Sequence, residues 1–90
     1  MRWTWDPRKA ASNKAKHGVS FDLAESVFDD PLHLSQPDPH PDNDRWQTIG
    51  CVDQVCILVV HTWDDEQKRG RIISARKATR HERRQYEEEA

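Results

Sequence analysis

A basic stretch of the chain holds the residues whose types and spacing could do chemistry. Between Lys68 and Arg84 the sequence has eight Lys and Arg but only one acidic residue, Glu82. Arginine donates two parallel hydrogen bonds from a planar fork, a geometry that suits phosphate. Glu82 and Tyr86 are four residues apart, so on a helix they would share one face. The stretch therefore predicts a local site for a phosphate-bearing ligand.

The net charge of the chain conceals this local field. The 90 residues carry a formal charge of −2, yet residues 1–19 carry +4, residues 20–66 carry −10 and residues 67–90 carry +4. Two basic segments thus flank an acidic middle. Such a segment can attract phosphate even when the molecule as a whole is slightly acidic.

Length and composition indicate one small domain, residues 1–90. Only 34% of the residues are hydrophobic, so the four tryptophans must supply much of a thin core. No apolar run approaches the ~20 residues of a membrane span, and no signal-peptide pattern is present. We therefore expect a cytoplasmic protein without membrane contact. Cys51 and Cys56 could face each other across a hairpin, but in the cytosol they are expected to be reduced core thiols.

Local signals predict a short strand and two helices in the first third of the chain. Arg2–Trp5 favours a strand, and Asp6 is a good N-cap because a proline follows at the first helical position. This helix should end before Gly18, which suits the left-handed C′ position. Ser20 then caps a second helix whose apolar residues recur at helical spacing as far as Phe28.

The rest of the chain predicts strands and a last helix. Arg45–Val52, Val55–Trp63 and Arg69–Ala75 favour antiparallel strands. Pro31–Asp44 contains four prolines and indicates mostly loop, with room for a short strand around Leu32–Leu34.

Thr79 and Glu82 fit a capping box, so a helix should run from about Arg80 to Glu88. The order of elements predicts an α+β domain: a short N-terminal strand, two helices, an antiparallel sheet of three to four strands and a C-terminal helix. Helices would cover one face of the sheet and leave the other open. An open face beside a basic helix is a suitable platform for nucleic acid.

Short motifs spread along the chain occur in the same order in a known family. They are Trp5-Asp6-Pro7, Lys9, Asn13, Lys16-His17-Gly18-Val19, Phe21, Val27-Phe28-Asp29-Asp30-Pro31, Thr48-Ile49-Gly50, Arg71-Ile72-Ile73-Ser74-Ala75-Arg76-Lys77-Ala78-Thr79, Glu82-Arg83 and Tyr86. In these motifs the sequence resembles BrnT-type toxins over almost its whole length. The resemblance implies a RelE-like fold and a small ribonuclease toxin of a type II toxin–antitoxin pair, which arrests growth. It also implies RNA as substrate and a BrnA-type ribbon-helix-helix antitoxin, through which alone operator DNA would be contacted.

RNA can be cleaved without metal when its own 2′-hydroxyl attacks the adjacent phosphate. The enzyme must supply a base, positive charge on the phosphate and a proton for the departing oxygen. We predict Arg76, just past the last strand, as the ligand of the scissile phosphate. Glu82 would be the base, Arg83 would stabilise the developing charge, and Tyr86 would stack a base or deliver a proton.

Each of these assignments has a structural alternative. Arg76 could be a surface arginine paired with an acid of the middle segment. The capping box alone explains Glu82, and the ring of Tyr86 could simply pin the last helix to the sheet.

Four further residues are predicted to bind substrate: Lys16, His61, Arg71 and Arg80. Lys9, Asn13 and Lys16 recur at helical spacing and could contact RNA or antitoxin, or form a solvated helix face. His61 alternates with apolar residues on its strand, a pattern that also fits a structural histidine.

No metal or cofactor is expected. His33, Asp38, His40, Asp42 and Asp44 follow no known closed zinc or calcium spacing. Two rival functions remain open at this point: a non-catalytic module or adaptor that only binds RNA or antitoxin, and a decayed toxin kept for antitoxin binding.

Overall fold

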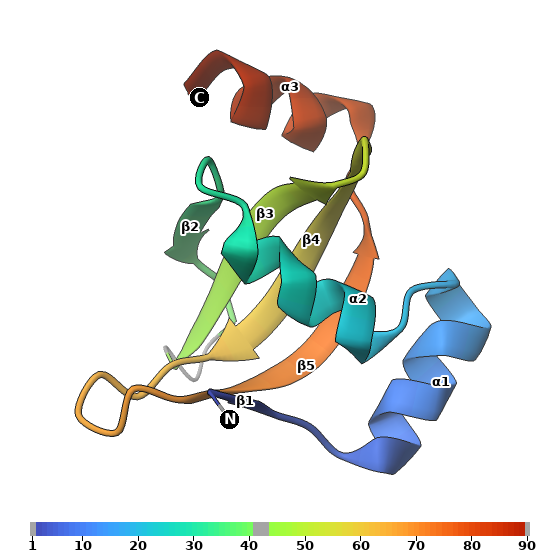
Figure 1. The fold of residues 1–90 in the computed structure, drawn as a ribbon, viewed down its shortest axis with the longest axis vertical. Coiled ribbons are helices and arrows are strands. Elements are labelled where there is room, and N and C mark those ends of the chain that lie inside the picture. Colours follow the sequence, from blue (N-terminus) through green and yellow to red (C-terminus); the bar gives the residue numbers. More distant parts are fainter. Residues whose placement is uncertain (1, 41–43, 90) are drawn as a thin grey trace.

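The computed structural model describes residues 2–40 and 44–89 of the chain and has the predicted α+β class. A five-stranded sheet in the order β1-β5-β4-β3-β2 is packed against three α-helices (Figure 1). The elements are β1 (Trp3–Thr4), α1 (Pro7–His17), α2 (Phe21–Ser26), the 3₁₀ helix η1 (Val27–Asp29), β2 (Leu34–Pro37), β3 (Arg45–Val52), β4 (Val55–Thr62), β5 (Gly70–Lys77) and α3 (Arg80–Glu89). None of the described helices is long and apolar enough to cross a membrane.

The two N-terminal helices begin and end where their capping residues predict. The Asp6 side chain accepts a hydrogen bond from the Arg8 backbone N–H at 2.9 Å. Gly18 ends α1 in the left-handed conformation, with φ of 73°, which glycine adopts at little cost. Ser20 caps α2 by accepting from the Leu23 N–H at 3.1 Å. The second predicted helix is therefore confirmed, although its last turn is the 3₁₀ helix η1.

The sheet has more strands than the three to four predicted, and it is mixed. Strand β1 pairs with β5 in parallel, whereas all other neighbours are antiparallel. The short strand predicted around Leu32–Leu34 is found two to three residues later, as β2 along the edge of β3. The turn between β3 and β4 has positive φ at both Asp53 and Gln54, the geometry of a two-residue hairpin.

Cys51 and Cys56 form a disulfide, so the prediction of two reduced thiols is wrong. The tight turn sets the register of the hairpin and places the two residues directly opposite each other. They occupy the pair next to the turn-closing pair, where side chains of antiparallel strands approach most closely. The hairpin pairing considered from the sequence is therefore present, and only the expectation of reduced thiols, drawn from the expected compartment, fails.

Alternate residues of β4 contribute to two apolar cores. Ile57 and Val59 face α1 and α2 in the larger core, together with Trp3, Val19, Phe21, Ala24, Val27, Ile72 and Ala75. Cys56 and Leu58 face the other way and pack with Ile49 and Tyr86 of α3. The second face is therefore covered by α3 at one end, so the prediction that this face is open is wrong there.

A buried amide fastens α1 to the sheet. Asn13 donates from Nδ2 to the carbonyl oxygens of Ala75 at 2.8 Å and Val19 at 3.0 Å. Its Oδ1 accepts from the Ala75 N–H at 3.1 Å. The side chain thus bonds to the β5 backbone as a neighbouring strand would. Asn13 is buried while Lys9 and Lys16 are exposed, so the three do not form one contact face.

Candidate functional site

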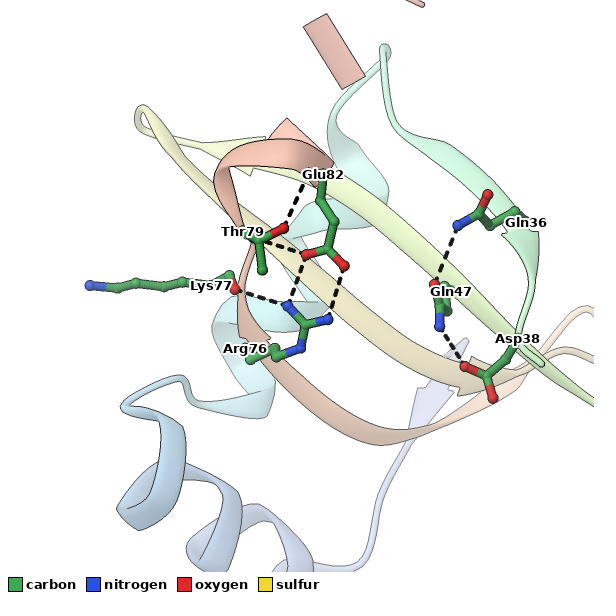
Figure 2. Close-up of polar contacts among 7 residues, drawn as sticks. All are labelled: Gln36, Asp38, Gln47, Arg76, Lys77, Thr79 and Glu82. Carbon is green, nitrogen blue, oxygen red and sulfur yellow. Dashed lines mark hydrogen bonds and ion pairs between the residues drawn. The ribbon is translucent and has the colours of Figure 1, made fainter. Parts of the chain in front are cut away.

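An arginine–glutamate pair joins β5 to the first turn of α3. Arg76 lies within β5, opposite Leu58, and not beyond the strand as predicted. Its Nη1 and Nη2 donate to Oε1 and Oε2 of Glu82 at 2.8 and 2.9 Å, which makes a bidentate contact (Figure 2). The side chains are 38% and 22% exposed, so solvent reaches the pair.

Glu82 is also fixed by its own helix. The capping box is confirmed: Glu82 accepts from the Thr79 N–H at 2.9 Å, and the Glu82 N–H donates to the Thr79 hydroxyl at 3.2 Å (Figure 2). The hydrogen bond from Arg76 lowers the pKa of Glu82 to about 2, although partial burial opposes this. The same bond raises the pKa of Arg76. Both groups are therefore charged at neutral pH.

Glu82 borders a groove between α3 and the strands β2, β3 and β4. The groove has a volume of about 270 Å3, and its floor is apolar, formed by Leu34, Ile49 and Leu58. Its remaining lining is polar: Ser35, Gln36, Gln47, Glu82, Gln85 and Glu89.

Amide groups organise the strand side of this groove. Gln47 accepts from Gln36 at 3.3 Å and donates to Asp38 at 2.6 Å, in a chain that faces the Arg76–Glu82 pair across the sheet (Figure 2). Sequence reasoning missed this wall because it did not place β2 beside β3. Gln47 is followed by the polar Thr48, so its strand carries no clear alternation that would have indicated this wall.

Tyr86 does not line the groove, and its ring and hydroxyl make their contacts elsewhere. Its ring is buried in the smaller core, and its hydroxyl donates to Asp30 Oδ2 at 2.5 Å. The same oxygen accepts from the Cys51 N–H at 2.8 Å. The bond to Asp30 raises the pKa of Tyr86 to about 12. In this arrangement the phenol anchors α3 to the end of η1.

Arg83 and Arg80 point away from the groove. They lie with Arg84 and Glu87 on the outward side of α3, and Arg83 donates to Glu87 at 3.1 Å. Helical spacing explains the division, because Glu82 and Arg83 are successive residues on a helix. The structure therefore brings Arg76 and Glu82 together but does not add Arg83 to them.

The other predicted substrate-binding residues are dispersed. His61 is buried on the α1 and α2 side of the sheet, and burial lowers its pKa. Lys16 is exposed in the last turn of α1, and Figure 1 shows that helix well apart from α3. Arg71 is exposed and lies five residues before Arg76 along β5, roughly 16 Å at the rise of an extended strand.

Among residues 2–40 and 44–89, no group of three or more His, Cys, Asp or Glu lies close enough to hold a metal ion. Asp42, one of the residues considered for such a site, falls outside the described residues. What the described chain offers instead is a paired guanidinium and carboxylate at the rim of a groove.

Fold and site together define a small α+β protein with a bidentate arginine–glutamate pair beside a surface groove. Residues 5–82 match the family model described as the ribonuclease toxin BrnT of type II toxin–antitoxin systems. Since the match covers most of the chain, this protein belongs to the BrnT family of ribonuclease toxins. No curated protein compared with it gave a match.

Proposed function

We propose that this chain is a metal-independent endoribonuclease and that Arg76 binds the scissile phosphate of RNA. The observation that carries the proposal is the two-pronged contact between Arg76 and the Glu82 carboxylate at the rim of the groove. Two oxygens of a phosphate can accept from the same arginine fork. The carboxylate thus occupies the position that an RNA phosphate would take.

Exchange of these anions would also prepare the base. When phosphate takes over the Arg76 fork, Glu82 loses the hydrogen bond that holds its pKa near 2, and the pKa rises toward its ordinary value. A more basic carboxylate beside the phosphate can then accept the proton of the 2′-hydroxyl. The 2′-oxygen bonds to phosphorus, and the bond to the 5′-oxygen breaks. The products would be a 2′,3′-cyclic phosphate and a 5′-hydroxyl end.

Three of the other predicted residues take supporting roles in this proposal. The arginines on the outward side of α3, Arg80 and Arg83, would hold phosphates flanking the cleavage point through charge. Tyr86 would act as a positioning residue, because its bond to Asp30 fixes the helix that carries Glu82. The departing 5′-oxygen would then take its proton from water.

Cleavage of a labelled RNA by purified protein in excess EDTA tests the proposal. Arg76→Ala should lower the rate constant by about 10²–10³, the usual cost of removing one electrostatic contact to a transition state. Arg69→Ala is the matched control, since Arg69 is an exposed arginine whose side chain bonds to Gln67. Products with 2′,3′-cyclic phosphate ends are expected. Intact RNA with wild type, or equal cleavage by the Arg76 variant, would overturn the assignment.

We further propose that a BrnA-type ribbon-helix-helix antitoxin neutralises this toxin in the cytoplasm and alone contacts operator DNA. Membership of a type II toxin family supports an antitoxin partner. Growth arrest on expression, relieved by coexpression of an adjacent ribbon-helix-helix gene, is the expected result. A chain that binds that antitoxin but neither arrests growth nor cleaves RNA would be the non-catalytic module.

A further inference from the structure

A second hollow lies on the opposite side of the sheet from the Arg76–Glu82 pair. It has a volume of about 210 Å3, and its walls come from β1, η1, the segment around β2, and the end of β4. The lining residues are Arg2, Trp3, Phe28, His33, Ser35, His61 and Trp63. Five of these seven side chains are aromatic or imidazole rings: Trp3 of β1, Phe28 of η1, His33, His61 of β4 and Trp63.

The rings hold one another in place. Trp3 stacks on Phe28 with centroids 3.9 Å apart and an interplanar angle of 16°. The His61 ring meets both edge-on, at 5.0 Å from each. Trp63 leans on Trp3 at 5.3 Å and remains only partly buried, as does Phe28. The hollow therefore presents rigid, preformed ring surface, to which a nucleobase can stack.

Hydrogen bonds fix which atoms on the wall can accept. A carbonyl oxygen can only accept, so His61 donates from Nδ1 to Thr62 O at 3.0 Å. Its Nε2 then accepts from Thr48 at 2.6 Å, and the Thr48 hydroxyl accepts from Ser35 at 2.7 Å. The Ser35 oxygen keeps its lone pairs for another donor. By the same logic His33 donates from Nδ1 to Asp30 O at 2.7 Å.

The charged groups that line this hollow favour an anionic occupant. The Arg2 guanidinium carbon lies 5.4 Å from the centre of the Trp63 ring, so a cation stands at the rim. The seven lining residues include no carboxylate, whereas Glu82 and Glu89 line the groove and Glu87 lines the outward side of α3. One carboxylate contacts the wall from outside the hollow, because Trp63 donates from Nε1 to Asp65 Oδ1 at 3.2 Å.

We propose that this hollow binds one nucleotide of single-stranded RNA, with its base against Phe28 and Trp63 and its phosphate against Arg2. The inference rests on the ribonuclease function proposed above and adds a substrate subsite to it. Ser35 lines both this hollow and the groove beside Glu82, because it lies on the edge strand β2. A strand of RNA passing over that edge can therefore occupy both.

Fluorescence anisotropy with a labelled, fully 2′-O-methylated RNA tests binding without cleavage, since that RNA lacks the attacking hydroxyl. Trp63→Leu should weaken binding about tenfold, the scale of one base–aromatic stack. Trp46→Leu is its control, a 39% exposed tryptophan that does not line the hollow. Equal losses in the two variants, or a loss below twofold in Trp63→Leu, would overturn the subsite.

A charge variant keeps the test independent of any folding defect at Trp63. Arg2→Gln should lower the slope of log Kd against log salt by about 0.7, the value for one phosphate of a single strand. Arg8→Gln, at an exposed arginine outside the hollow, should leave the slope unchanged. An unchanged slope in Arg2→Gln would overturn the phosphate contact.

Cleavage of unmethylated RNA, measured in parallel, separates this inference from the function on which it rests. Wild type that binds through Trp63 and Arg2 but does not cleave would support the subsite and overturn the nuclease. Wild type that cleaves while both variants bind normally would support the nuclease and overturn the subsite.

Discussion

Replacing Glu82 with glutamine isolates the charge of the Arg76–Glu82 pair. Glutamine has nearly the same length and shape, and its carbonyl oxygen can still accept from the Thr79 N–H that Glu82 now accepts. The helix cap is therefore largely kept, while the negative charge facing the guanidinium is lost. Any change in stability should then follow the ionisation of Glu82.

The size of the effect follows from the pKa of Glu82, which is lowered from 4.5 to about 2. In full, that shift corresponds to about 3 kcal/mol of stability. The Arg76 side chain is 38% exposed, so solvent screening reduces the expected value to about 1–2 kcal/mol. Because the pKa is depressed in the folded state, this stability is present above pH 4.5 and is lost as pH falls toward 2.

Urea unfolding at pH 7 and pH 3 measures this directly. Glu82→Gln should lower the free energy of unfolding by about 1–2 kcal/mol at pH 7, and the gap to wild type should shrink by half or more at pH 3. Glu87→Gln is the matched control because it breaks the ion pair between Arg83 and Glu87, whose side chains are 56% and 59% exposed. This substitution should lower the free energy of unfolding by less than about 0.5 kcal/mol at either pH. A gap for Glu82→Gln that is equal at both pH values would refute the reasoning.

Three further substitutions test how the site is held. Tyr86→Phe removes the hydroxyl that donates to Asp30 and should lower the free energy of unfolding by about 1–2 kcal/mol at pH 7, measured by urea unfolding. Because the pKa of Tyr86 is raised to about 12, wild type should lose this stability as pH rises from 10 toward 12. Asn13→Ala leaves buried backbone groups without partners and should cost about 2–4 kcal/mol, against less than about 0.5 for exposed Ser12→Ala, and equal losses would contradict the anchoring role. Gly50→Ala would bring a Cβ to 2.8 Å from a side-chain carbon of η1, so a loss of about 1–3 kcal/mol in thermal or urea unfolding is expected, and an unchanged stability would show that η1 yields easily.

Helix ends and hairpin strands could be predicted because their signals are local. Asp6, Gly18 and Ser20 act on backbone groups within four residues, so the sequence neighbourhood contains the whole cause. The same holds for the capping box at Thr79 and Glu82. That box also places Glu82 on the helix face that meets Arg76.

The parts that could not be predicted depend on pairing between distant segments. The parallel pairing of Trp3 with Gly70 has no signal in either short segment. Asn13 stands among exposed polar residues in its helix, so only the tertiary fold reveals that it serves Ala75. The separation of Arg83 from Arg76 needed the exact placement of α3 on the sheet. The disulfide of Cys51 is a local feature of a predictable hairpin, and it was missed because reduced thiols were expected in the cytosol.

The two edges of the sheet differ in how much of their main chain is covered, and the amide of Asn13 is one cause. Beyond β4, the backbone of β5 is occupied by β1 at Gly70 and Arg71 and by the Asn13 amide at Ala75. Among residues 2–40 and 44–89, strand β2 at the opposite border has a single strand neighbour, and it is twice as long as β1. Another polypeptide that extends this sheet would find the longer free strand edge at β2. That edge lies next to the groove that Glu82 borders. Geometry would then allow one bound segment to lengthen the sheet and obstruct the groove together.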